Sequence, residues 1–197
     1  FVVLLADLAD AGIGASLSRF LPPLIRGGKE RQAHAITKAA FVFEIVVSII
    51  LGCIVVFTAP QLSRYIFDKT DIILIRVASI GIIAIVFAGF VNFLYSARQR
   101  FTVVTTLLIV ISGARVVGAL VFLYMGQFTL FNAFLLLVLP SFLSIVPLIV
   151  SSVQFLPTPL QKKDWLDLFS FAKYLGVNKV FTAVASRIDV LLISAFL

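Results

Sequence analysis

The sequence contains few of the side chains that form disulfides, metal sites and acid–base catalysts. Its 197 residues include one cysteine, Cys53, and one histidine, His34. A disulfide within the chain needs two thiols, and a structural metal site needs about four thiolate or imidazole ligands. The composition therefore excludes an intrachain disulfide and a metal cluster. We expect no cofactor, and we interpret His34 as a solvated surface residue.

Charged residues are also scarce. They make up 13% of the chain, whereas hydrophobic residues make up 61%. A soluble domain has about a quarter charged and about half apolar residues. The net charge of +7 would favour a nucleic-acid partner in a soluble protein, but here the basic residues lie mostly between apolar runs. That distribution is typical of membrane proteins, so we predict an all-α, multi-span helical bundle and expect no nucleic acid as a partner.

Catalytic motifs are missing as well. The sequence has no nucleophile elbow, no glycine-rich phosphate loop and no metal-ligand spacing, so we do not expect an enzyme. Because the chain starts and stops inside apolar runs, we expect an internal piece of a longer protein. Three Asp-x-x-Asp pairs are interpreted as solvated charges at helix ends: Asp7/Asp10, Asp68/Asp71 and Asp164/Asp167.

Six apolar segments approach the ~20 residues that a helix needs to cross a bilayer. The fifth contains Pro140 and Pro147, which predict a kinked or tilted helix. We therefore expect about six transmembrane helices. The segments are 1–17, 39–58, 72–96, 102–125, 129–156 and 176–197.

The loops between these segments predict the orientation. Three of them, 18–38, 97–101 and 157–175, carry ten basic residues, whereas 59–71 and 126–128 carry two. Cytoplasmic loops are enriched in lysine and arginine, so the three basic loops are predicted to face the cytoplasm. The first of them overlaps the stretch Asp10–Arg31. There, glycines that allow close backbone approach and prolines that lack a helix donor predict a bend at the membrane face: Gly12, Gly14, Pro22 and Pro23.

Residues 161–175 predict an amphipathic helix that follows an N-cap and capping-box pattern at Thr158–Gln161. We expect this helix to lie along the inner membrane surface and to link two bundles. The N-terminal bundle would comprise residues 1–160, and residues 176–197 would form the first helix of the second bundle. The alternative is a plain polar linker. The apolar face would contain Trp165, Leu168, Phe169 and Ala172.

Five of the ionisable residues inside predicted spans are candidates for function, because a charge there costs about 2.5–3.5 kcal/mol on insertion scales. Arg115, Arg187 and Arg76 suggest a cationic cavity for a phosphate-bearing substrate, because guanidinium groups bind phosphate oxygens bidentately. The alternative is that these arginines pair with carboxylates or extend to the interface. Asp189 and Glu44 are candidates for binding a coupling proton or cation, although Glu44 could simply reach water at the inner surface.

Two stretches resemble a known family. Asp10, Gly12, Gly14 and Arg19, followed by Arg26–Arg31, resemble the first cytoplasmic loop of polysaccharide-biosynthesis proteins. These are the Wzx-type O-antigen and teichoic-acid exporters of the multidrug/oligosaccharidyl-lipid/polysaccharide (MOP) superfamily. The segment Ser186–Leu197, with Arg187 and Asp189, resembles the start of that family's seventh helix. On this match the chain would cover helices two to seven.

The resemblance implies a MATE-like fold with two pseudo-symmetric six-helix bundles around a central cavity. It also implies transport of pyrophosphate-linked oligosaccharides on a lipid carrier across the cytoplasmic (inner) membrane for cell-surface polysaccharide such as O-antigen. The implied partners are that lipid-linked substrate, membrane lipids, glycan polymerases and glycosyltransferases. Our leading hypothesis is therefore a flippase that works by alternating access. The alternatives are a cation-coupled multidrug exporter, for which deep carboxylates should dominate, and a non-transporting scaffold of a glycan-assembly complex.

Overall fold

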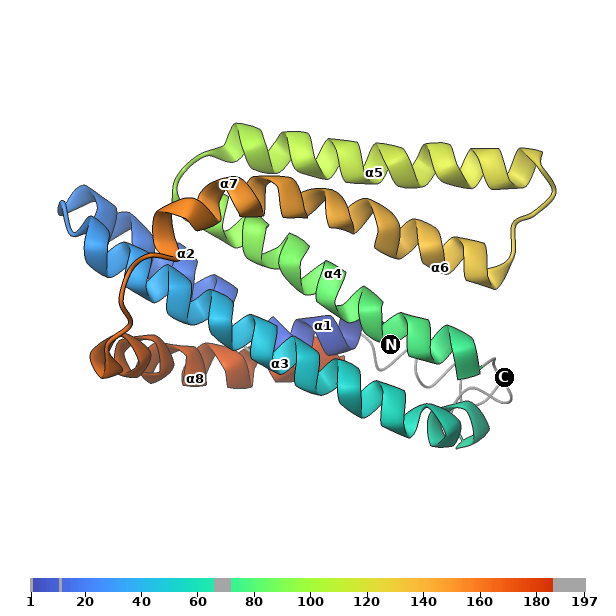
Figure 1. Ribbon diagram of the computed structural model, residues 1–197, viewed down its shortest axis with the longest axis horizontal. Coiled ribbons are helices and arrows are strands. Elements are labelled where there is room, and N and C mark those ends of the chain that lie inside the picture. The colour runs from blue at the N-terminus through green and yellow to red at the C-terminus, as the bar shows by residue number, and fades with distance from the viewer. Residues whose placement is uncertain (1, 11, 66–71, 186–197) are drawn as a thin grey trace.

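The computed structural model describes residues 2–10, 12–65 and 72–185, and within these ranges every regular element is a helix (Figure 1). This confirms the all-α prediction for the described part of the chain. The elements are α1 (Val2–Asp10), α2 (Ile13–Arg26), α3 (Glu30–Tyr65), α4 (Ile72–Ala97), α5 (Phe101–Tyr124), α6 (Leu130–Val138), the 3₁₀ helix η1 (Leu139–Ser144), α7 (Ile145–Phe155) and α8 (Lys162–Ala185).

Four helical segments of the described chain are long and apolar enough to cross a membrane: Glu30–Ser63, Ile72–Ala97, Phe101–Tyr124 and Leu130–Phe155. They confirm the second to fifth predicted spans. The first predicted span, 1–17, is instead divided between α1 and α2, and most of the sixth lies outside the described residues. Of the roughly six transmembrane helices expected, four are therefore confirmed in the described part of the chain.

Pro140 and Pro147 predicted a kinked or tilted helix in the fourth of these segments. This segment is indeed not one regular α-helix. It passes from α6 through η1 to α7, and Pro140 lies in the first turn of η1. Proline has no backbone N–H, so a carbonyl in the preceding turn loses its helical donor. The backbone therefore adopts 3₁₀ geometry at this point.

The bend predicted at Pro22 and Pro23 is wrong, because both prolines lie inside α2. Their missing N–H groups would have bonded to the carbonyls of Ser18 and Arg19, which are exposed residues in the middle of the helix. Water can satisfy such carbonyls, so the break is avoided. The helix ends at Arg26, and Gly28, with a φ of 68°, then allows the Lys29 N–H to bond to the Leu24 carbonyl at 2.9 Å.

Three predicted cytoplasmic loops lie at one end of the bundle, named here the basic end (Figure 1). Lys38 of α3 donates hydrogen bonds to the carbonyls of Leu156 (2.6 Å) and Thr158 (2.9 Å), which connect α7 to α8. Arg98, in the α4–α5 turn, donates to Gln154 Oε1 at 2.8 Å. These contacts confirm that the three loops share one side.

A helix is present where the amphipathic helix was predicted, but its boundaries differ from the prediction. α8 begins at Lys162 and continues without interruption past residue 175 to Ala185, so the linker and the start of the last segment are one helix. Asp164 Oδ2 accepts the Gln161 N–H at 2.8 Å, which places the cap three residues later than Thr158. Its buried face includes Leu168 and Ala172.

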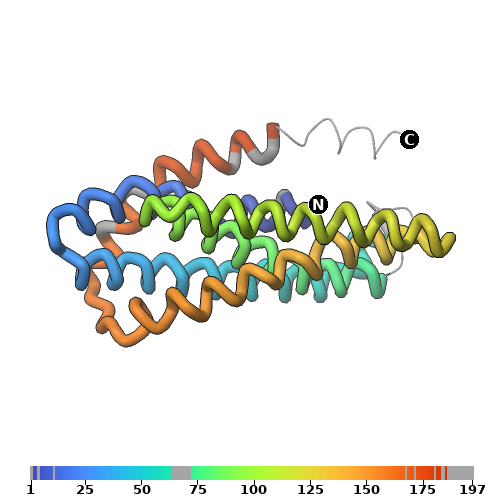
Figure 2. Tube along the Cα trace, turned by 90° about the horizontal axis from the view of Figure 1, so that it is seen from above, coloured from blue at the N-terminus to red at the C-terminus, as the bar shows by residue number. Residues whose placement is uncertain are grey.

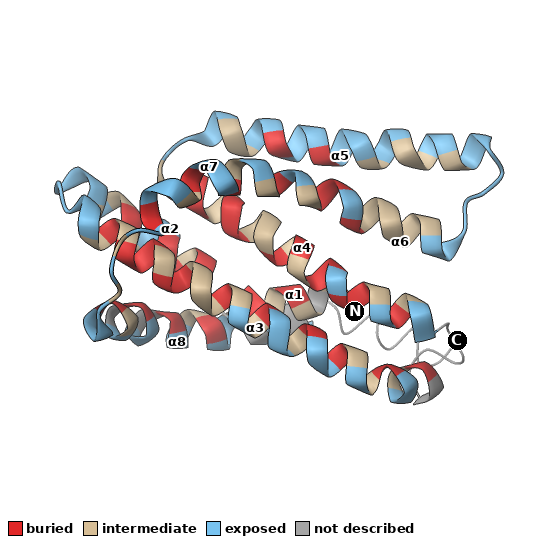
Figure 3. Ribbon diagram, viewed as in Figure 1, coloured by how far each residue is buried: buried red, intermediate tan, exposed pale blue. Residues whose placement is uncertain are grey.

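One cluster of buried residues lies mainly between α2, α3, α4 and α7, and a second lies between α1, α3 and α4, whereas α5 is mostly exposed (Figure 3). Phe41 of α3 contacts the rings of Phe90 (5.3 Å) and Phe155 (5.6 Å), which lie on α4 and α7. Aromatic pairs at such separations add to the stability gained by burial. α8 packs beside α1, α2 and α3, and it diverges from the bundle toward its C-terminal end (Figure 2).

Candidate functional site

The junction between α1 and α2 lies inside the bundle. Gly12 has a φ of 77°, and a Cβ atom there would lie 2.7 Å from the Leu175 carbonyl carbon and the Gly176 nitrogen of α8. A Cβ on Gly14 would lie 2.1 Å from the ring of Phe93 on α4. Glycine is required at Gly12 both for its φ and for this contact. The close backbone approach predicted for these glycines is confirmed, and the chain is interrupted at Gly12, between α1 and α2 and inside the bundle.

Asp10 ends α1 and is 8% exposed, which corrects its interpretation as a solvated helix-end charge. Its Oδ1 accepts the Gly14 N–H at 2.8 Å, and its Oδ2 forms an ion pair with Lys179 Nζ of α8. The carboxylate also lies at the N-terminus of α2, where the helix dipole favours negative charge. Asp10 thus joins the broken helix to α8.

Lys179 was not identified as a site residue from the sequence. Its ammonium lies 5.4 Å from the centre of the Phe93 ring, in addition to its ion pair with Asp10. The signal was available, because Lys179, like Arg187, is a basic residue within the predicted span 176–197. The same criterion had selected Arg115 and Arg187.

Glu44 lies on α3 and is 1% exposed. Neither carboxyl oxygen has a hydrogen-bond partner among the described residues. The charged groups that act on it are Asp10 and Lys179, so these three residues form one cluster, the Asp10–Glu44–Lys179 cluster. Glu44 follows Glu30, the first residue of α3, by 14 positions or ~21 Å. Its burial excludes simple contact with water at the inner surface.

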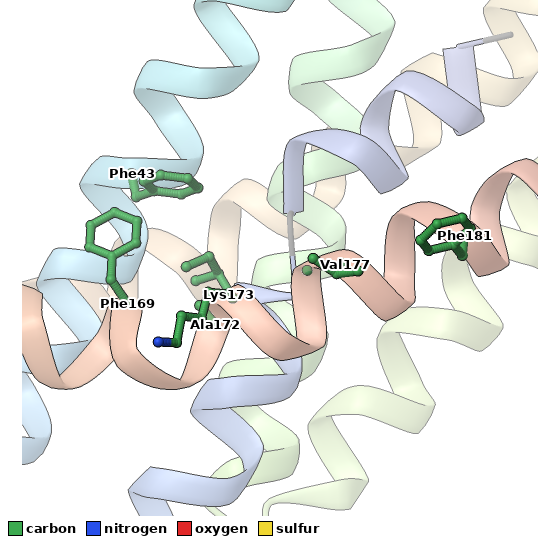
Figure 4. A pocket seen from close by; sticks show the side chains of 8 residues that line it. Phe43, Phe169, Ala172, Lys173, Val177 and Phe181 are labelled. Carbon is green, nitrogen blue, oxygen red and sulfur yellow. The ribbon is translucent and has the colours of Figure 1, made fainter.

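A pocket of about 440 Å³ lies beside this cluster, between α2, α3 and α8. Figure 4 shows the rings of Phe43 and Phe169 at one end and that of Phe181 at the other. The lining is apolar except for Lys173, and it includes Gly176, which packs on Gly12. A second pocket of about 330 Å³ at the basic end is polar, and His34 lines it together with Arg98 and Arg100. His34 is thus half-buried rather than fully solvated.

Arg115 lies on α5 and contacts the break between α6 and η1. One terminal nitrogen donates to the Leu137 carbonyl at 2.9 Å and to Ser141 Oγ at 3.0 Å. In a 3₁₀ pattern the donor to Leu137 would be the N–H of Pro140, which does not exist. Arg115, together with the Ser141 hydroxyl that donates to the same carbonyl at 3.2 Å, therefore replaces a missing backbone donor. Its Nε is buried and has no partner among the described residues.

The other predicted site residues are dispersed. Arg76 is exposed near the start of α4, at the end opposite the basic end (Figure 1), and no described contact joins it to Arg115. Arg19 is exposed on α2. Arg187 and Asp189 lie outside the described residues. The described structure thus brings Glu44 together with Asp10 and Lys179, but it does not bring the arginines together.

Comparison with known proteins identifies one match. A family model described as polysaccharide biosynthesis protein covers residues 20–197, which includes Glu44 and Lys179 but not Asp10. Searches of curated proteins and of solved structures find no match. The family match confirms the resemblance seen in the sequence.

Proposed function

Because the chain belongs to the polysaccharide biosynthesis protein family, we propose that it forms part of a flippase for lipid-linked oligosaccharides. The substrate would carry a pyrophosphate between its lipid and its glycan, and transport would proceed by alternating access across the cytoplasmic membrane. The basic end would face the cytoplasm, where the loops retain lysine and arginine.

The observation that carries this proposal is a charged cluster inside a membrane-type bundle of this family. Asp10, Glu44 and Lys179 come from three different helices and meet where α1 and α2 are interrupted. Ionisable groups at such positions are expensive and are retained where a solute or ion passes. Interrupted helices likewise occur at the binding sites of transporters. A scaffold without a transport pathway has no need of either feature.

Arg115, Arg187 and Arg76 are the proposed contacts to the pyrophosphate. For Arg115, binding of a phosphate would compete with existing hydrogen bonds, because its terminal nitrogen already bonds to Leu137 and Ser141. The free Nε offers one further donor, and full bidentate binding would require the side chain to leave the α6–η1 break. Partners such as glycan polymerases and glycosyltransferases belong to the same proposal.

A second candidate function is a cation-coupled multidrug exporter of related fold. The buried pair of carboxyl groups, Asp10 and Glu44, favours it, since deep carboxylates suit cationic substrates and coupling ions. It differs from the leading proposal in its cargo.

Reconstitution separates these functions. The intact protein would be placed in lipid vesicles with a fluorescent undecaprenyl pyrophosphate oligosaccharide, and inward and outward populations would be distinguished with a membrane-impermeant quencher. We expect protein-dependent equilibration of the label. Equilibration no faster than in protein-free vesicles would overturn the flippase proposal. Accumulation of a cationic dye in the same vesicles would support the exporter, and the failure of both assays would leave the scaffold.

A further inference from the structure

Glu44 is a buried carboxyl group with an unusual lack of partners. It is 1% exposed, and neither of its oxygens lies within hydrogen-bond distance of a described partner, although the Asp10 carboxyl group is close enough to act on it. An ionised carboxylate in such a place would have lost its water without gaining compensating hydrogen bonds. A buried acid in these surroundings is accommodated by holding a proton on one oxygen.

The charges around Glu44 lead to the same assignment. Of the elements packed against α3, α1 brings Asp10 and α8 brings Lys179. Within the described part of the chain, α2, α4 and α7 bring no charge that acts on Glu44. Lys179 is already paired with Asp10, which also accepts the Gly14 N–H. One ammonium therefore balances one carboxylate, and no cation is left for a second.

We infer that Glu44 is a proton-binding residue whose protonation controls the packing of α8 against the α1–α2 junction. With the proton on Glu44, Asp10 and Lys179 balance each other and α8 closes on Gly12. When the proton passes to water, two carboxylates compete for one ammonium and the cluster carries a net negative charge. Hydration of that charge requires α8 to separate from the junction.

The assignment of Lys179 as the moving partner follows from its position. Its side chain is 27% exposed, compared with 11% for that of Asp10, so Lys179 is the more accessible of the two partners. Asp10 is also held by the N-terminus of α2 and is fixed to the bundle. The proton on Glu44 therefore controls the side of the cluster that is free to move. The use of this movement to drive transport rests on the proposed function.

A distance measurement tests the inference without any substrate. Nitroxide labels would be attached at the exposed positions Ile50 of α3 and Tyr174 of α8, in the intact protein with Cys53 replaced by alanine. We expect one short distance at acidic pH and a second, longer population at alkaline pH. Glu44→Gln, which keeps the shape but cannot ionise, should lose the longer population at every pH.

The matched control is Glu30→Gln, the same change on the same helix at an exposed residue of its first turn. It should retain the pH response of the unaltered protein. A distance that does not vary with pH in the unaltered protein would overturn the inference. Persistence of the pH response in Glu44→Gln would do the same.

The transport assay then distinguishes this inference from the proposed function. An imposed proton gradient should accelerate equilibration of the labelled oligosaccharide in the unaltered protein and in Glu30→Gln, and this acceleration should be lost in Glu44→Gln. A pH-dependent distance without any oligosaccharide transfer would retain the proton site and reject the flippase. Transfer that responds to a sodium gradient and not to pH would retain the flippase and overturn the proton site.

Discussion

Asp10 and Lys179 are 169 positions apart in the chain, yet they form an ion pair that joins the end of α1 to α8. The pair holds the backbone of α8 against Gly12, where there is no room for a side chain. It also supplies the only described cation that acts on Glu44. This one contact therefore contributes to the packing of α8, to the charge balance around Glu44 and to the proposed coupling.

Replacement of Lys179 should lower the stability of the protein. Lys179→Ala leaves Asp10 and Glu44 without a cation, and we expect the free energy of unfolding to fall by about 1–3 kcal/mol. This is below the 3–5 kcal/mol for a fully buried pair, because both partners retain some exposure. Thermal unfolding in detergent measures the change. Lys173→Ala, an exposed lysine on the same helix, is the control and should have little effect; equal melting temperatures for the two variants would contradict the prediction.

Two glycines with the same backbone conformation should respond differently to alanine. Gly12 and Gly28 have φ values of 77° and 68°, so alanine at either position costs about 1–2 kcal/mol in backbone strain. At Gly28 nothing lies within 4 Å of the added Cβ, whereas at Gly12 the Cβ meets the backbone of α8 at 2.7 Å. Gly12→Ala should therefore destabilise the protein markedly more. Similar losses of thermal stability in both variants would mean that α8 does not press on the junction.

The two roles considered for Arg115 can be separated by two measurements. If the side chain replaces the missing donor to Leu137, Arg115→Ala should lower the free energy of unfolding by about 1–3 kcal/mol. If it binds pyrophosphate, the variant should lose oligosaccharide transfer while remaining in the membrane. We expect both losses. Arg76→Ala, at an exposed position, should leave thermal stability unchanged. Normal transfer in folded Arg115→Ala would reject its role toward the substrate.

The orientation can be checked by cysteine labelling. In an otherwise cysteine-free protein, Gln99→Cys marks the α4–α5 turn at the basic end and Gln127→Cys marks the α5–α6 turn at the other end. An impermeant maleimide applied to intact cells should label Gln127→Cys at once and Gln99→Cys only after permeabilisation. The reverse pattern would place the basic end outside.

Local sequence patterns were sufficient for the spans but not for the cluster. Apolar length predicted α4 and α5 to within one residue at each end, and Pro140 predicted the break that became η1. These features depend on residues close to one another in the chain. The prolines of α2 led to the wrong prediction of a break. The cost of a missing backbone donor depends on whether the freed carbonyl can reach water, and the sequence alone does not show this.

The pairing of Asp10 with Lys179 depends on how α8 folds back on the first two helices. No periodicity relates residues so far apart, so Asp10 was read by its local surroundings as a solvated residue. Glu44 was selected correctly as an ionisable residue within a span, and its depth was underestimated because α3 starts nine residues before the predicted segment. Lys179 satisfied the same criterion and was overlooked.

Because α8 is one uninterrupted helix, a small rotation about one end displaces the other end by several ångströms. Between Lys162, at the basic end, and Lys179 the helix rises ~26 Å with no hinge. A swing of about 10° around its first turn would carry the ammonium group through ~4 Å at that radius, enough to part it from Asp10. A partner that binds the basic end of α8 would thereby control the distant contact between Lys179 and Asp10.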